Sequence, residues 1–410
     1  MRMTWYAASL GAGGVTRGMP FLALLLFASQ IGPGEFAQVA MLAVASAWLT
    51  LLSSGGLEFT AIYEERRRLD GRPPRPLAPA WFVALPVAAL AGLCFAGFAI
   101  LVGFPFWQWA VMIGSAVVLG LCQMPVLGRA RIRHDKRALI EFVFIPFLAA
   151  GLLRIAALIV VGSGSSLDVL WLWVSGDVAQ AAIVIIFAIR RIGLAGLRVP
   201  SRQTVRDGVA TTRRSGPWVL TAGLQGALAN LDKFLLYGLV SSETFGVYAL
   251  SYQLANIANI LVSEYNKARY GRIIRQSVSG AVARLAAESG RYLLVLLSGG
   301  AVSVLGALLL FRPTYPDIGW MTAILVASLL PIPLYVPLEN QVAVLDGRTA
   351  EVAMASLAGV ITGAAVLLAL VGNLGVIAGA IGTFFGYAVT TAVLGAFYAR
   401  AARRRAVRSG

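Results

Sequence analysis

Charge is scarce in this sequence, because Asp, Glu, Lys and Arg together make up only 13% of its 410 residues. Soluble domains carry roughly a quarter of charged residues. Apolar residues account for 59%, and the mean hydropathy is +0.80. No long polar stretch separates the apolar runs. The composition therefore indicates an integral membrane protein and leaves no room for a soluble catalytic domain.

Histidine and cysteine are almost missing. The only histidine is His134, and the two cysteines, Cys94 and Cys122, both lie inside apolar runs, where they are expected to pack as small hydrophobes. A site built from several imidazole or thiolate ligands is therefore not expected, and we predict neither a metal nor a cofactor. Membrane-bound polymerases and ligases usually carry their catalytic groups in a sizeable outer loop. All outer connections here are short, so we expect no enzyme.

The apolar runs that remain predict twelve membrane-spanning helices. A spanning helix needs about 20 mostly apolar residues, and the period-two alternation of barrel strands is missing. We therefore expect an all-α membrane protein. The predicted spans are residues 5–31, 36–62, 80–103, 106–128, 139–162, 167–189, 215–239, 244–267, 291–311, 318–342, 349–371 and 375–399.

Lysine and arginine gather in alternate connections between these spans. The opposite connections contain a single arginine, Arg312, against the acids Glu35, Asp168, Glu243 and Asp317. Basic connections remain in the cytoplasm, so we predict that both termini are cytoplasmic and that the protein is a multi-pass protein of the cytoplasmic (inner) membrane. The net charge of +16 is spread over short clusters. It fits attraction to anionic membrane lipids better than binding of nucleic acid.

Two halves are predicted from a short internal match. Residues 35–42 align with residues 244–251 at an offset of 209, and the phenylalanine, the small residue after it and a later alanine agree. With an even number of spans, this predicts two six-helix halves in a parallel repeat. We assign residues 1–200 to the first half, 201–214 to a cytoplasmic linker and 215–410 to the second half with its basic tail.

Five charged side chains are predicted to lie deep in the spans: Arg17, Arg154, Asp177, Asp232 and Lys233. Each would cost at least about 2.5 kcal/mol in lipid, so they should face the protein interior. Arg154 and Asp177 lie at similar depth on neighbouring spans, which leaves an ion pair and a transport role both open. Asp232 and Lys233 are consecutive and point about 100° apart. We expect them not to neutralise each other and Lys233 to face a central cavity.

The motifs L-F-A-S-Q-I-G-P-G-E-F-A-Q-V-A, L-L-S-S-G-G-L-E-F and N-L-D-K-F-L-L-Y-G-L-V-S-S-E-T-F-G-V-Y-A-L-S-Y-Q-L-A open the two predicted halves. They resemble the polysaccharide and O-antigen flippase family, whose members are lipopolysaccharide and exopolysaccharide biosynthesis membrane proteins of the multidrug/oligosaccharidyl-lipid/polysaccharide (MOP) exporter superfamily. Ala37 and Gln38 depart from the family, which has a glycine and an aromatic residue there.

The resemblance implies transport of a polyprenyl-diphosphate-linked oligosaccharide across the membrane by alternating access. In that case Arg17, Arg154 and Lys233 are candidates to line a cationic cavity for the diphosphate. Asp177 or Asp232 would bind a coupling proton or sodium ion. Two alternatives remain: a drug or metabolite antiporter of the same superfamily, and a polysaccharide polymerase or ligase.

Overall fold

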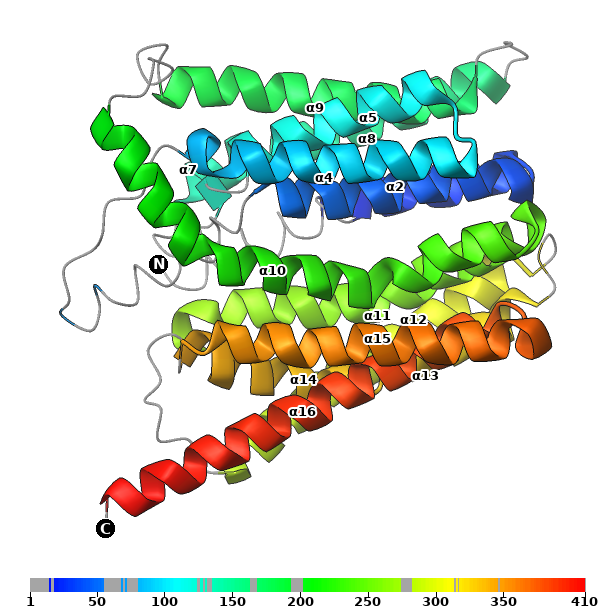
Figure 1. The fold of residues 1–410 in the computed structure, drawn as a ribbon. Coiled ribbons are helices and arrows are strands. Elements are labelled where there is room, and N and C mark those ends of the chain that lie inside the picture. Colours follow the sequence, from blue (N-terminus) through cyan, green and yellow to red (C-terminus); the bar gives the residue numbers. More distant parts are fainter. Residues whose placement is uncertain are drawn as a thin grey trace. The chain divides into compact units, whose positions relative to one another are not determined.

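A computed structural model describes the chain over residues 15, 18–54, 68, 71, 80–123, 126, 127, 130, 135–162, 168–192, 202–273, 282–312, 315, 317–345 and 347–409. These residues are helical or lie in short turns, and none of them is in a strand (Figure 1). Arg17 lies outside the described residues. The chain divides into two compact units, unit 1 (Met1–Gly223) and unit 2 (Leu224–Gly410).

Unit 1 is a set of antiparallel helices. They are Gly18–Gln30, α2 (Pro33–Ser53), α4 (Ala80–Val102), α5 (Phe106–Cys122), α7 (Lys136–Leu139), the π-helical turn η1 (Ile140–Phe144), α8 (Ile145–Gly162) and α9 (Val169–Ile192). α7, η1 and α8 follow one another without a break and form the predicted fifth span.

A long helix, α10 (Arg202–Leu239), leads from unit 1 into unit 2. Residues 202–214, which we assigned to a linker from the sequence, are its first turns. Unit 2 continues with α11 (Ser242–Ile273), α12 (Val282–Leu310), α13 (Ile318–Ser328), α14 (Ile332–Glu339), the π-helical turn η3 (Asn340–Leu345), α15 (Thr349–Leu374) and α16 (Ile377–Ser409).

The tenth predicted span, residues 318–342, is not one helix. It breaks between Ser328 and Ile332, next to Pro331 and Pro333. Proline has no backbone N–H to donate to the preceding turn, and its ring clashes with the carbonyl four residues earlier. The two prolines account for the interruption of the helix at this point.

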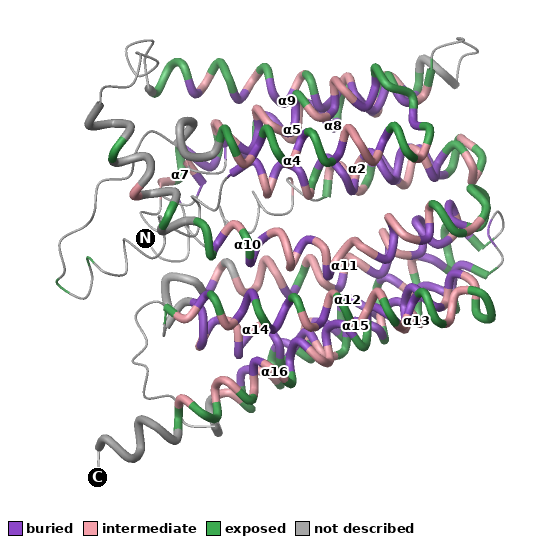
Figure 2. The backbone as a smooth tube through the Cα atoms, in the orientation of Figure 1, coloured by how far each residue is buried: buried purple, intermediate pink, exposed green. Residues whose placement is uncertain are grey.

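Large apolar side chains are exposed on several helices, as expected for helices that contact lipid. On α4, Leu93 is 71% and Ile100 69% exposed, and on α12, Val302 is 60% and Leu309 78% exposed. Figure 2 shows exposed residues recurring along the helices of both units. Nine helices in the described part of the chain are long and apolar enough to cross a membrane. The prediction of an all-α, multi-pass membrane protein is confirmed, and which side faces the cytoplasm stays a prediction.

Both units use the same packing scheme. In unit 1, α2 packs on α4 and α5, α4 packs on α5, and α9 packs on α5 and α8. In unit 2, α11 packs on α12 and α13, α12 packs on α13, and α16 packs on α13 and α15. The starts of α2 and α11, at Pro33 and Ser242, are 209 residues apart, and those of α9 and α16, at Val169 and Ile377, are 208 apart.

The short internal match lies at the start of the same helix in each unit. Residues 35–42 and 244–251 have the same succession of exposed, half-buried and buried side chains, position by position. Phe36 and Phe245 are fully buried, and their amides donate to the carbonyl four residues earlier over 3.0 and 2.9 Å. An offset of 209 residues therefore pairs equivalent positions of α2 and α11.

Candidate functional site

The ion pair of Asp232 and Lys233 lies inside unit 2 on α10. The Lys233 ammonium is 2.9 Å from Asp232 Oδ1 and donates to the Ala229 carbonyl over 2.5 Å. The prediction that these neighbours do not neutralise each other is wrong. Their Cα–Cβ bonds diverge, but the four-carbon lysine stem is long enough to bring its charge back to the adjacent carboxylate.

Two tyrosines of α11 complete this pair. Tyr248 donates its hydroxyl to Asp232 Oδ2 over 2.5 Å, and the Lys233 ammonium lies 3.3 Å from the centroid of the Tyr252 ring. The tyrosines are four residues apart and so lie on one face of the helix. Lys233 is only 1% exposed and Asp232 6%, so both charges are held by protein groups rather than water.

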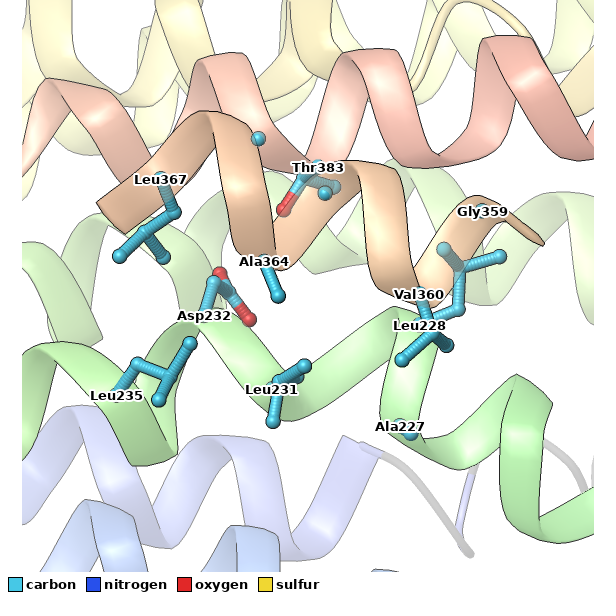
Figure 3. A pocket seen from close by; sticks show the side chains of 12 residues that line it. Ala227, Leu228, Leu231, Asp232, Leu235, Gly359, Val360, Ala364, Leu367 and Thr383 are labelled. Atoms are coloured by element: carbon cyan, nitrogen blue, oxygen red, sulfur yellow. The ribbon is translucent and has the colours of Figure 1, made fainter. Parts of the chain in front are cut away.

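A small pocket opens beside this pair between α10, α15 and α16, and Asp232 is one of its lining residues (Figure 3). Gly363 of α15 and Gly382 and Thr383 of α16 line the opposite side. Lys233 is not in the lining. The carboxylate, and not the ammonium, therefore lines this pocket, and the prediction that Lys233 faces a central cavity stays a prediction.

Close contact of α15 and α16 depends on glycines. A Cβ on Gly359 would lie 2.5 Å from the Gly386 carbonyl oxygen, and one on Gly363 would lie 2.9 Å from that of Gly382. Side chains at these positions would force the helices apart. Small residues at such a crossing let the backbones of two helices approach closely.

A second polar cluster of unit 2 was missed in the sequence. Gln225 donates to Glu339 Oε1 and to the Tyr335 hydroxyl, each over 2.6 Å, and Tyr335 packs edge-on against Tyr387 at 5.9 Å. The spacing of four between Tyr335 and Glu339 was the available signal, since it puts both on one helix face.

The predicted deep charges of unit 1 form a separate ion pair. Arg154 of α8 donates through Nη2 to Asp177 of α9 and through Nε to the Trp173 carbonyl over 3.2 Å. Its guanidinium carbon lies 4.1 Å from the Trp173 ring centroid. Arg154 is 2% exposed and Asp177 4%. Of the two readings left open, the ion pair is the one formed, and a transport role for these residues stays a prediction.

A glycine makes room for this arginine. A Cβ at position 176 would lie 2.5 Å from Arg154 Nε, so Gly176 allows the arginine side chain to lie across α9.

Within the described residues, no group of three or more His, Cys, Asp or Glu side chains could hold a metal ion.

Outside the spanning helices, Asp135 caps α7. Its Oδ1 accepts the Ala138 amide over 3.0 Å, and its Oδ2 accepts from Arg191 over 3.2 Å. Chiefly the amide, and then the arginine, favour the charged carboxylate and lower the pKa of Asp135.

No protein-family model matches the chain, and no curated protein matches its sequence. Solved structures do match over almost its whole length. A MATE transporter in complex with MaL6 has a TM-score of 0.64 and 14% identity over 100% of this chain and 98% of its own. An outward-facing multidrug resistance MATE transporter of the MOP superfamily gives 0.61 and 13% over 100% and 97%. The eukaryotic MATE transporter AtDTX14 gives 0.57 and 14%, over 98% of each chain.

The chain has the MATE transporter fold. At such low identity the likeness concerns the fold alone, and it agrees with the two-halved helical architecture found here. What these transporters carry does not follow for this chain from the fold.

Proposed function

We propose that this chain is a MOP-superfamily transporter of the cytoplasmic membrane that moves a polyprenyl-diphosphate-linked oligosaccharide between leaflets by alternating access. Exchange of a proton or sodium ion at Asp232 would supply the coupling. The observation that carries the proposal is a buried carboxylate lining a pocket within a MATE fold. Buried ionisable residues in membrane segments are costly and mark ion or substrate pathways.

The partners of Asp232 give it two states. In the first state, which has the contacts of the structure, the carboxylate binds the Lys233 ammonium and accepts a hydrogen bond from the Tyr248 hydroxyl. A proton or cation reaching Asp232 from the pocket competes with the ammonium. Lys233 then keeps the Ala229 carbonyl and the Tyr252 ring. Ion occupancy thus alters the contact of α10 with α11, a difference that can bias two conformations.

The substrate class rests on the sequence. The flippase-like motifs open both halves, and the net charge of +16 lies in the connections predicted to face the cytoplasm. Clustered lysine and arginine raise the local concentration of an anionic diphosphate headgroup. The assignment of Arg17 to a cationic cavity stays a prediction.

Reconstituted vesicles test this function. Purified protein is placed in liposomes with a fluorescent polyprenyl-diphosphate oligosaccharide, and leaflet transfer is followed by a membrane-impermeant quencher under imposed proton or sodium gradients. We expect gradient-dependent transfer that Asp232→Asn abolishes. The matched control Asp317→Asn alters an acid whose Oδ1 binds Trp320 on the protein surface, and it should transfer at the wild-type rate. A transfer rate that is the same with and without a proton or sodium gradient would disprove the coupling. A polymerised product would identify an enzyme.

A drug antiporter is the second candidate, favoured by a different observation. Both deep cations that the structure describes, Arg154 and Lys233, are neutralised by acids, and the pocket presents Asp232. An acid at the pocket suits a cationic substrate better than an anionic one. Matching solved structures include a multidrug resistance transporter. Gradient-driven uptake of a cationic dye into the same vesicles, with no transfer of the lipid-linked sugar, would favour this alternative.

A further inference from the structure

One end of unit 1 carries a charged cluster that is separate from the buried ion pairs. Glu141 of η1 lies at its centre and accepts from two arginines, from Arg137 Nε over 2.6 Å and from Arg191 Nε over 2.7 Å. Arg191 Nη1 also donates to Asp135 Oδ2 over 3.2 Å. One carboxylate thus holds two guanidinium groups that come from α7 and α9.

These bonds leave several guanidinium donors available. Within the described part of the chain, both Nη atoms of Arg137 and the Nη2 atom of Arg191 donate to no protein group. The Arg137 side chain is 83% exposed, whereas that of Glu141 is only 13% exposed. Lys136 and Arg190 are also exposed, directly beside the two arginines in the sequence. The basic residues outnumber the acids, so the accessible surface of the cluster is positive.

The cluster lies on a firmly packed base. The guanidinium carbon of Arg191 is 5.8 Å from the centroid of the Phe142 ring, and this ring packs on Phe187 of α9 at 6.2 Å. Gln123 is fully buried and donates its side-chain amide to the Phe142 carbonyl within the π-helical turn. Such turns are rare and frequently lie at functional sites. The arginines are therefore positioned before a ligand arrives, which reduces the entropic cost of binding.

Exposed apolar side chains lead along both helices to these arginines. Ile140 is 51% and Phe144 38% exposed, and they follow Arg137 by three and seven residues on the same helix face. On α9, Ile186 is 49% exposed and lies four residues before Arg190. Each apolar face therefore ends in an exposed arginine. A phospholipid has the same succession, because its acyl chains lie in the bilayer and its phosphate lies at the edge.

We infer that this end of unit 1 binds an anionic phospholipid, whose phosphodiester accepts from Arg137, Arg190 and Arg191 and whose acyl chains lie along η1 and α9. Arginine suits this ligand, because its planar fork donates two parallel bonds to phosphate oxygens. A choline headgroup would add a cation beside the arginines, so a headgroup without an ammonium is favoured. The predicted orientation puts the site in the cytoplasmic leaflet, whose surface is negative. The inference does not depend on the transported substrate or on Asp232.

Native mass spectrometry tests this site, because it resolves complexes of the purified full chain with single lipid molecules. Titration with dioleoyl-phosphatidylglycerol gives the Kd of the first lipid. Arg137→Gln/Arg190→Gln removes two phosphate donors and keeps both bonds of Arg191, and we expect it to raise this Kd about 10-fold or more. Dioleoyl-phosphatidylcholine has the same acyl chains and should bind the wild type at least about 10-fold more weakly. Equal binding of the two lipids would overturn the inference.

A matched control separates this site from general attraction by a basic protein. Arg291→Gln/Arg400→Gln removes two exposed arginines of unit 2 and therefore the same net charge. Charges outside the site are screened, so this variant should change the Kd by less than about twofold. Equal weakening by the two double variants would show that no particular site exists. If Arg137→Gln/Arg190→Gln does not fold, Arg190→Gln alone breaks no described bond and should raise the Kd about threefold or more. An unchanged Kd would then overturn the inference.

Two competitors identify the occupant. Inorganic phosphate has no acyl chains and should not displace phosphatidylglycerol at millimolar concentration; displacement would identify a site for a free anion and overturn the inference. A polyprenyl diphosphate that displaces phosphatidylglycerol at equal concentration would identify an entrance for the transported lipid, and it would equally overturn the phospholipid as the occupant. Asp232 is unchanged in every variant, so failure here is separable from failure of the proposed function.

Discussion

Replacing Lys233 by methionine tests whether the buried pair is a stabilising unit. Methionine keeps the length and most of the volume of the side chain but removes the charge. The variant leaves Asp232 with one described donor, the Tyr248 hydroxyl at 2.5 Å. We expect a loss of about 3 kcal/mol of unfolding free energy. The reason is that an uncompensated carboxylate remains in a site that water hardly reaches.

The magnitude follows from the geometry. At 2.9 Å and an effective dielectric constant of about 20, the gross attraction between Lys233 and Asp232 is about 6 kcal/mol. Desolvation of both ions offsets much of it, and removing one partner of a buried pair typically costs 3–5 kcal/mol. The retained Tyr248 hydrogen bond puts the expected loss near the lower end.

A double-mutant cycle supplies the assay. Unfolding of wild type, Lys233→Met, Asp232→Asn and the double variant is followed by circular dichroism during titration with sodium dodecyl sulfate in mixed micelles. The double variant buries no charge, so its stability should return to within about 1 kcal/mol of wild type. Losses that simply add, or a Lys233→Met loss below about 1 kcal/mol, would refute the pairing.

Two glycine substitutions on α15 form a matched pair, and a third substitution tests a helix cap. Gly359→Ala puts a methyl group 2.5 Å from the Gly386 carbonyl oxygen and should cost about 1–3 kcal/mol in the same titration. Gly372→Ala, on the same helix with no atom within 4 Å, should be neutral or stabilising by up to about 1 kcal/mol, and equal effects would contradict the crossing. Asp135→Ala removes the cap on the Ala138 amide and should cost about 1 kcal/mol at neutral pH. Because the folded pKa of Asp135 is lowered, its contribution is fully present above the unfolded pKa of about 3.9. The contribution is lost as the pH falls through the folded pKa, so wild type and variant should converge only below that lower value.

Much of the fold could be predicted from the sequence, because a bilayer leaves few choices. Long apolar runs must be helical, and their spacing indicated the two halves. The eight-residue match at offset 209 identified the repeat correctly. The break after Ser328 could not be located from the sequence, because neighbouring prolines allow either a kink or an interruption and packing decides between them.

The candidate site was less predictable. Counting residues along each helix correctly predicted that Arg154 and Asp177 lie at similar depth. Because their spans are neighbours and antiparallel, the two side chains can then meet. The pairing of Lys233 with Asp232 did not follow from direction around the helix, because Cα–Cβ bonds show where a side chain starts and not how far a long one reaches. The cluster of Gln225, Tyr335 and Glu339 joins residues 110 and 114 positions apart, which no local pattern reveals.

The spacing of 209 residues also has an evolutionary meaning. The starts of α2 and α11 keep it, and those of α9 and α16 differ from it by one residue, although few residue identities survive between the units. If the units descend from one duplicated gene, substitutions accumulated freely while insertions and deletions largely cancelled or were rejected. A hydrocarbon layer of fixed thickness accounts for that imbalance, since it prescribes how long a helix must be and leaves open which apolar residues compose it.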